Sequence, residues 1–110
     1  MCVFCQIIKG EIPSHKVYEN EKVYAFLDIK PVRPGHVLVI PKNHSANIEE
    51  TKSEDLKELA EGVKEVGEIL KEKFPCPAYN IILNNGEEAG QEVSHIHFHL
   101  IPRFENDDLK

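Results

Sequence analysis

The stretch His95-Ile96-His97-Phe98-His99-Leu100-Ile101 decides the fold of this chain, because three imidazoles alternate there with large apolar side chains. Alternation has the two-residue period of a β-strand, so the pattern predicts a strand over 93–102 with all three histidines on one face. Ile96, Phe98 and Leu100 are then expected to pack into a core on the other face. Three surface histidines without a function would show the same spacing, but the rarity of histidine argues against chance.

Length and composition indicate which class of protein contains this strand. The 110 residues, 41% of them hydrophobic, predict one domain over 1–110. No apolar run approaches the ~20 residues of a membrane span, and the N-terminus lacks the features of a signal peptide, so we expect a cytoplasmic protein without membrane contact. The formal net charge is −6 and no basic cluster stands out, which argues against a nucleic-acid partner.

The other segments predict further strands and two helices. Strands are expected over 16–29, broken into a hairpin at 19–22, over 36–41 and over 79–83, with a turn-rich loop at 84–90. Residues 2–9 are apolar enough for a short helix or packed turn.

One long helix is predicted from Thr51, whose hydroxyl can cap it while Glu54 reaches back in a capping box. Its apolar residues recur at spacings of three and four as far as Phe74, and Pro75 prevents continuation. The order of strands, long helix and strands favours an α+β fold. Its sheet is expected to be mostly antiparallel and covered on one side by helices.

The histidine row is open to two kinds of chemistry. At ~3.3 Å per residue the first and third histidines lie ~13 Å apart at Cα, so one metal cannot bind all three, although adjacent pairs could share one. A neutral imidazole is also a nucleophile, a hydrogen-bond donor to anions and a proton carrier. Phosphate is favoured as the target because Asn84-Asn85-Gly86 and Ala89-Gly90-Gln91 offer amide side chains and flexible backbone N–H groups.

These residues resemble the histidine triad family, whose signature His-x-His-x-His followed by two apolar residues is matched by 95–101. FLDI at 26–29, GHVLVIPKNH at 35–44, Asn84 and Gly90-Gln91 follow in the family's order and approximate spacing. The ending IPR at 101–103 is similar to Fhit and to bacterial or archaeal members. The resemblance, which covers nearly the whole chain, implies a five-stranded, mostly antiparallel sheet with one long and one short helix. It also implies a homodimer whose sheets join into ten strands.

The resemblance further implies a purine-nucleotide site. The middle histidine is the family's nucleophile, so His97 is expected to attack the α-phosphorus and form a nucleotidyl-histidine that water hydrolyses. The resemblance assigns phosphate contact and proton transfer to His99 and His36. The implied substrate contacts are Asp28 for the ribose, Asn84, Gly90 and Gln91 around the phosphate, and Val3, Phe4, Ile7, Phe26 and Ile29 for the base, although core residues use the same types.

Glu92 departs from the family's pattern. Many members carry Ser or Thr at this position, and in the Hint branch that hydroxyl helps to hold the phosphate and protonate the leaving group. A carboxylate would repel a phosphate unless it turned away or stayed protonated. Only the backbone N–H of Glu92 is therefore carried over as a substrate contact, and the leaving-group preference is not assigned.

The pair Cys2-x-x-Cys5 is a second place for chemistry. By its spacing alone, zinc, redox chemistry and coincidence are all open, but the thioredoxin interpretation fails because no strand precedes the pair. Some bacterial and archaeal family members, and the related galactose-1-phosphate uridylyltransferases, bind structural zinc through such a pair and two histidines. The resemblance thus implies zinc held by Cys2, Cys5, His44 and His95, with reduced free thiols as the alternative.

Together these residues lead us to expect a homodimeric purine-nucleotide hydrolase or transferase. It would split the α-phosphate bond of a nucleoside 5′-phosphoramidate, an acyl-nucleotide or a dinucleoside polyphosphate and release AMP or GMP. The alternative is a nucleotide-binding regulatory or scaffold protein with incidental catalysis, which has no need for an intact nucleophile. A zinc-dependent hydrolase would need an open coordination position, which two cysteines and two histidines close.

Overall fold

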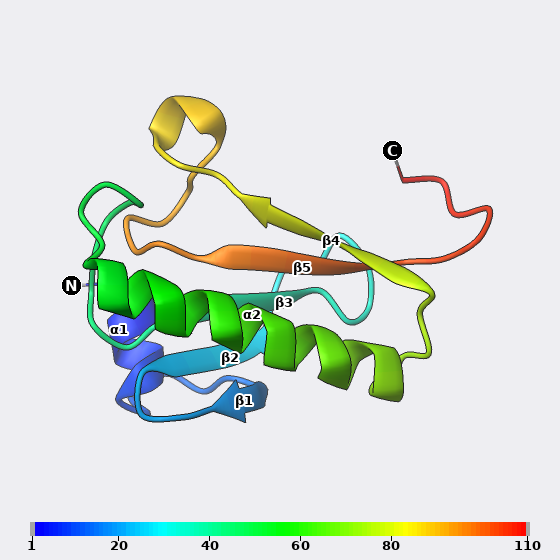
Figure 1. Cartoon of the computed structure of the whole chain (residues 1–110), viewed down its shortest axis with the longest axis horizontal. Helices are drawn as coiled ribbons and strands as arrows, with labels where there is room; N and C mark the ends of the chain where they lie inside the picture. The colour runs from blue at the N-terminus through cyan, green and yellow to red at the C-terminus, as the bar shows by residue number, and fades with distance from the viewer. Residues whose placement is uncertain (1, 110) are drawn as a thin grey trace.

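The computed structural model describes residues 2–109 and is built on one antiparallel sheet (Figure 1). The strands lie in the spatial order β1-β2-β3-β5-β4, and every neighbouring pair is antiparallel. Their bounds are β1 Lys16–Glu19, β2 Val23–Leu27, β3 Val37–Pro41, β4 Ala78–Leu83 and β5 Phe98–Arg103. The predicted α+β fold with a mostly antiparallel five-stranded sheet is confirmed.

The long helix α2, Ser53–Lys73, covers one face of this sheet (Figure 1). Its apolar stripe packs on alternate residues of β2, β3 and β5, which together form the main core. The helix approaches β2 closely at Gly62, where a Cβ would lie 2.7 Å from Cγ1 of Val23. No helix within residues 2–109 is long and apolar enough to cross a membrane.

The predicted capping box at the start of α2 is wrong. The N-cap is Lys52, whose side chain makes no capping hydrogen bond. The Thr51 hydroxyl instead donates to the Asn47 carbonyl at 2.7 Å and lies 2.8 Å from the Ser45 hydroxyl. A hydroxyl can satisfy only a few partners at once, and here the loop before α2 uses it.

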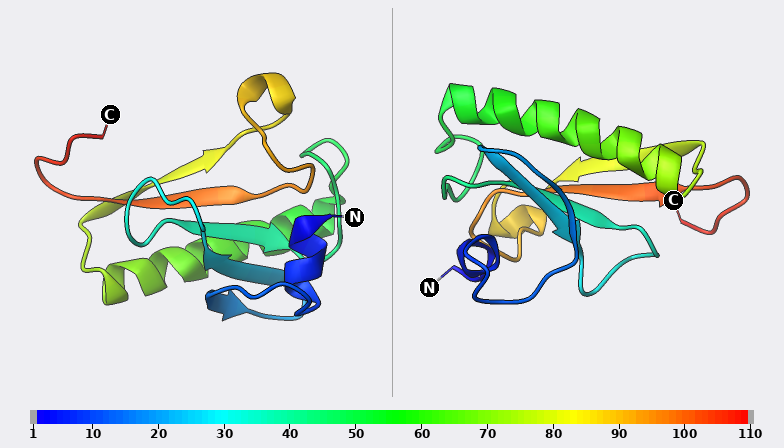
Figure 2. Two further views of the ribbon diagram at one scale, coloured as in Figure 1. Left: turned by 180° about the vertical axis from the view of Figure 1, so that it is seen from behind. Right: turned by 90° about the horizontal axis from the view of Figure 1, so that it is seen from below.

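The short helix α1, Val3–Ile8, lies on the opposite face of the sheet from α2 (Figure 2). Successive strand residues point to opposite faces, so the residues that α2 leaves uncovered are available to it. Phe4 of α1 packs there in a second buried cluster with Tyr24, Phe26, Leu38 and Ile40. The expectation that helices cover only one side is therefore wrong, because six residues with one buried aromatic suffice to cover part of the second face.

The final strand is shorter than predicted. β5 begins at Phe98, and its ladder with β3 pairs only Val37–Val39 with residues 98–100. Upstream, the Ile96 amide donates to the Ser45 carbonyl at 2.8 Å instead of joining the sheet. Pro41 ends β3 and has no N–H to extend the ladder. The alternation survives nevertheless, since Ile96 and Leu100 are buried in the α2 core and Phe98 packs against it.

Candidate active site and metal-ligand cluster

A pocket of about 250 Å³ opens on the α1 side of the sheet. Helix α1 and the sheet supply apolar walls, and the segments at 28–30 and 92–99 supply the carboxylates, the lysine and the imidazoles. The lining residues are Val3, Phe4, Ile7, Pro13, Ser14, Phe26, Leu27, Asp28, Ile29, Lys30, Leu38, Glu92, Val93, His97 and His99. All five residues expected around a base are among them. Phe4 and Phe26 are buried in its depth, whereas Ile29 is 85% exposed.

His97 is held in one tautomer. Its Nδ1 lies 2.8 Å from the carbonyl oxygen of His95, so Nδ1 carries the hydrogen and donates it. A neutral imidazole has a single N–H, which leaves a lone pair on Nε2. The ring is 5% exposed, lines the pocket and meets the edge of Phe4 at 5.2 Å between centroids. His97 therefore has the form of a nucleophile.

A chain of hydrogen bonds fixes His36 and His99, which we call the histidine pair. The Val32 amide donates to Nδ1 of His36 at 3.1 Å, so the hydrogen of His36 is on Nε2. That Nε2 donates to Nδ1 of His99 at 3.0 Å, so the hydrogen of His99 is on its own Nε2. Burial lowers the pKa of His36, and burial followed by the neighbouring His97 and His36 lowers the pKa of His99 to about 4. Both rings are thus neutral near pH 7.

Asp28 lies beside the histidine pair at the end of β2. Its Oδ1 accepts from the Lys30 amide at 3.0 Å, and its Oδ2 lies 3.6 Å from Nε2 of His36. Ligand atoms of Asp28, His36 and His99 come within 4.8 Å of one another, as in a metal site. The hydrogen on Nε2 of His36 occupies the nitrogen that a metal would need, so this group is arranged to donate hydrogen bonds.

The loop 84–92 contributes fewer pocket contacts than the resemblance implies. Asn84 and Gly90 lie close together, since a Cβ on Gly90 would be 3.7 Å from Nδ2 of Asn84, but neither lines the pocket. The Gln91 amide is used by backbone groups: its oxygen accepts from the Gly86 N–H at 2.8 Å, and its nitrogen donates to the Ala46 carbonyl at 2.6 Å and to the Val93 carbonyl at 2.9 Å. Glu92 is exposed at the pocket rim.

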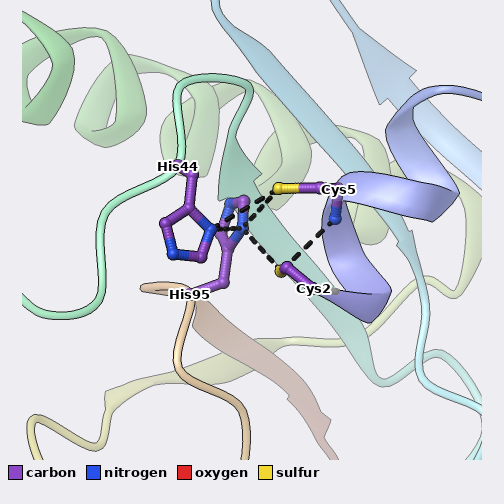
Figure 3. Close-up of side chains that lie close together, drawn as sticks. All are labelled: Cys2, Cys5, His44 and His95. Atoms are coloured by element: carbon purple, nitrogen blue, oxygen red, sulfur yellow. Dashed lines mark hydrogen bonds between the residues drawn. The ribbon is translucent and has the colours of Figure 1, made fainter.

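A second site lies on the other side of His97, where Cys2, Cys5, His44 and His95 form what we call the metal-ligand cluster (Figure 3). Nε2 of the fully buried His95 donates to the Pro41 carbonyl at 2.9 Å, so its Nδ1 lone pair faces the cluster. That Nδ1 lies 3.3 Å from Sγ of Cys2, 3.7 Å from Sγ of Cys5 and 3.2 Å from Nδ1 of His44.

These separations fit one tetrahedral ion. Bonds of about 2.0–2.3 Å to nitrogen and sulfur place four tetrahedral ligand atoms about 3.3–3.8 Å apart. Burial lowers the pKa of His95 to about 4 and so favours the neutral, metal-binding ring. Burial and the adjacent Cys2 raise the pKa of the Cys5 thiol, a cost that a bound cation removes. The cluster therefore has the donors and the geometry to hold a metal ion.

The two sites share their supports. Cys2 is the N-cap of helix α1, which contains Cys5 and contributes Val3, Phe4 and Ile7 to the pocket. The carbonyl of His95, a cluster residue, holds the ring of His97.

Sequence reasoning missed several lining residues and one positioning contact. Ser14 and Lys30 line the pocket without belonging to any recognised motif, and Leu38 lines it although its motif at 35–44 is not assigned to the base. The Val32 amide that orients His36 is a backbone group, for which no side-chain pattern can signal.

Comparison with known proteins agrees with this geometry. A family model described as HIT domain matches residues 9–106. An uncharacterized HIT-like protein of Methanocaldococcus jannaschii is 53% identical over 107 residues, which are 97% of this chain and 82% of that protein. An adenosine 5′-monophosphoramidase of Candida albicans is 46% identical over 106 residues, which cover 93% of this chain and 70% of that protein. The crystal structure of a Zn-bound histidine triad family protein from Mycobacterium smegmatis superimposes with a TM-score of 0.94 at 37% identity, covering 99% of this chain and 79% of the other. With the triad, the fold and these relatives in agreement, the chain belongs to the histidine triad (HIT) family.

Proposed function

We propose that this protein is a purine-nucleotide hydrolase or transferase that cleaves the α-phosphate bond of nucleoside 5′-phosphoramidates, acyl-nucleotides or dinucleoside polyphosphates. The observation that carries the proposal is the tautomer of His97, whose Nε2 lone pair is free on the wall of a pocket with an apolar depth. The name of the Candida albicans relative, an adenosine 5′-monophosphoramidase, supports the phosphoramidate member of this set.

The reaction proceeds in two steps. For a phosphoramidate, Nε2 of His97 forms a bond to the α-phosphorus while the P–N bond breaks; the amine leaves with the bonding pair and takes up one proton from water. Water then attacks the nucleotidyl-histidine, AMP or GMP leaves, the bonding pair returns to Nε2, and one proton goes back to solvent. His99 presents its Nε2–H to the phosphate oxygens, where negative charge increases in each transition state. His36 orients His99.

The pocket supplies the binding contacts. The apolar wall formed by Val3, Phe4, Ile7, Phe26 and Ile29 suits a purine ring. The Asp28 carboxylate can accept hydrogen bonds from both ribose hydroxyls. Asn84 and the backbone around Gly90, Gln91 and Glu92 lie on the same loop and are assigned to the phosphate.

The test is AMP release by wild type and by His97→Ala from adenosine 5′-phosphoramidate, AMP-lysine, ADP and diadenosine tetraphosphate. We expect wild type to release AMP from at least one compound and His97→Ala to be at least about a thousandfold slower. His15→Ala is the matched control, because its exposed ring does not line the pocket. If wild type binds AMP but hydrolyses nothing, a regulatory or scaffold protein replaces the proposed enzyme.

We also propose that the metal-ligand cluster holds structural zinc, which would cross-link α1 to the segment before β5. The donor set of two thiols and two imidazoles supports zinc, as does the Zn-bound relative from Mycobacterium smegmatis. A closed four-ligand shell leaves no position for substrate. Thiols kept reduced for a metal are typical of the cytoplasm, which we propose as the location.

Finally, we propose a homodimer of one-domain chains, each spanning residues 1–110, with a purine nucleotide in each protomer. Strand β4 is at the sheet edge, and its Ile81 is 51% exposed, which supports pairing of two sheets there. Light scattering at micromolar concentration should give twice the 12.6 kDa chain mass, and a monomer mass would contradict the dimer.

A further inference from the structure

The rim of the pocket carries an unusual charge balance for a phosphate site. Among the lining residues in the described part of the chain, Lys30 is the one lysine or arginine, whereas Asp28 and Glu92 are carboxylates. Asp28 is engaged by the Lys30 amide and lies beside His36. A polyphosphate chain entering this rim therefore meets little positive charge to replace the water and counterions that it loses.

Glu92 is the free carboxylate of this rim. Its side chain is exposed, and within residues 2–109 no hydrogen bond or ion pair engages it. It belongs to the same segment as His97 and lines the pocket together with His97 and His99. An exposed carboxylate is charged at neutral pH, so its field acts on whatever passes the reacting histidines.

A second hollow adjoins the rim at Glu92. It is lined by Cys2, Val3, His44, Glu92, Val93 and Ser94, and it shares Val3, Glu92 and Val93 with the pocket. No Lys or Arg among the residues that the structure describes lines this hollow. Because the pocket depth suits the base, the group attached to the α-phosphorus must extend toward the rim, where the hollow and the Glu92 carboxylate are available to it.

We propose that Glu92 selects substrates by the charge of the leaving group, favouring phosphoramidates of amines that carry a second, cationic group over leaving groups that are anionic. The proposal rests on the proposed function and deepens it, since it names one substrate class for the same site. A cationic tail on the leaving amine is attracted by Glu92, while a carboxylate or a polyphosphate is repelled. Chemistry at phosphorus is unchanged: the P–N bond breaks, and the amine leaves with its bonding pair and takes one proton from water.

The experiment compares three AMP phosphoramidates of similar length whose leaving amines end in an ammonium, a methyl group or a carboxylate: 1,3-diaminopropane, butylamine and 4-aminobutanoic acid. The readout is the ratio of kcat/KM for the cationic substrate to that for the anionic one. Wild type should show a ratio about tenfold higher than Glu92→Gln, because the substitution keeps the size of the side chain and removes its charge. Comparing the two proteins cancels the intrinsic reactivities of the three amines.

Two further variants sharpen the result. Glu92→Lys should push the ratio below that of Glu92→Gln, since it reverses the sign of the field. Glu88→Gln should keep the wild-type ratio, because Glu88 is exposed on η1, Glu87–Ala89, and does not line the pocket. Raising the salt to about 1 M, where the Debye length is about 3 Å, should bring wild type close to Glu92→Gln.

The possible failures are distinguishable. Equal ratios in wild type, Glu92→Gln and Glu92→Lys would overturn the charge selection while leaving the hydrolase intact. Absence of AMP release from all three substrates by wild type, or release that persists in His97→Ala, would overturn the proposed function and this inference with it.

Discussion

Two groups of metal-type ligands lie on either side of His97, and they have opposite arrangements of hydrogen. The metal-ligand cluster and the group formed by Asp28, His36 and His99 each bring their ligand atoms within 4.8 Å of one another. By residue type and spacing, either could hold an ion. Each buried histidine carries its hydrogen on Nε2, and the difference lies in whether that N–H points out of the group, as at His95, or into it, as at His36.

Backbone groups make that difference. The Pro41 carbonyl accepts from Nε2 of His95, which turns a lone pair toward the two cysteines. The Val32 amide donates to Nδ1 of His36, which turns an N–H toward His99. An acceptor behind the ring thus leaves a lone pair facing the cluster, as a metal ligand requires, and a donor behind the ring leaves an N–H facing the neighbouring histidine.

The largest expected effect is on the metal-ligand cluster. Cys5→Ala removes one of four ligands, so zinc content should fall from about one equivalent to well below half. The melting temperature should fall by at least about 10 °C, because the metal binds only the folded chain. Metal analysis and thermal unfolding measure both.

Cys76→Ala is the matched control. Cys76 is buried in the α2 core, away from the cluster, so this variant should lose some stability but retain its zinc. Full zinc occupancy in Cys5→Ala would contradict the metal assignment. So would wild-type protein that, purified without added zinc, contains well under half an equivalent of zinc and has both thiols reactive.

Much of this comparison could be predicted from the sequence. Strict alternation at 95–101 predicts which residues enter the core, and Ile96 and Leu100 do so although β5 begins only at Phe98. The resemblance to zinc-binding family members predicts that Cys2, Cys5, His44 and His95 come together, and the structure places their ligand atoms within 4.8 Å of one another. These predictions succeed because they depend only on which side chains stand at which positions.

What could not be predicted depends on backbone geometry. The amino-acid sequence of residues 30–35 does not indicate that the Val32 N–H donates to His36. Thr51 and Glu54 have the spacing of a capping box, yet a competing carbonyl at Asn47 takes the hydroxyl. Placement of α1 on the second face depends on the packing of Phe4 against β2 and β3, a long-range contact that local patterns do not encode.

Lowering the pH should have a smaller effect on the stability of the folded protein, through the histidine pair. Asp28, His36 and His97 surround His99, and burial keeps its pKa near 4. The folded-state pKa is below the usual 6.5, so the unfolded chain binds protons first and this contribution to stability is lost as pH falls from about 6.5 toward 4. The melting temperature should drop by several degrees over that range.

Nitrogen NMR of the imidazole rings measures the tautomer and the protonation of His36 and His99 directly. At pH 7, His36 and His99 should both show Nε2–H tautomers, and neither should titrate near 6.5. An Nδ1–H tautomer at His36 would contradict the hydrogen-bond chain from Val32.

The smallest expected effect tests what holds Val32 in place. The neighbouring Arg33 lies 3.5 Å from Asp107, and Asp107 also accepts from Nε of Arg103 at 2.9 Å and from the Phe104 amide at 2.8 Å. These donors, led by Arg103, hold the pKa of Asp107 well below its usual range, so its charge persists at any pH where the protein is assayed. Asp107 thereby anchors the segment that presents the Val32 N–H to His36.

Asp107→Ala should release Arg33 and let this segment move, which weakens the hydrogen bond that fixes the histidine pair. We expect kcat for AMP release to fall about three- to tenfold while zinc content stays unchanged, because the metal-ligand cluster is supported from α1 and Pro41 instead. Asp108→Ala is the matched control: Asp108 also lies near Arg33, at 3.7 Å, but its side chain is 98% exposed, and such pairs contribute little. Equal kcat values in the two variants would mean that the Val32 amide keeps its position without the Arg33–Asp107 pair. Loss of zinc from Asp107→Ala would mean that the pocket and the metal-ligand cluster share further structural support besides α1 and the His95 carbonyl.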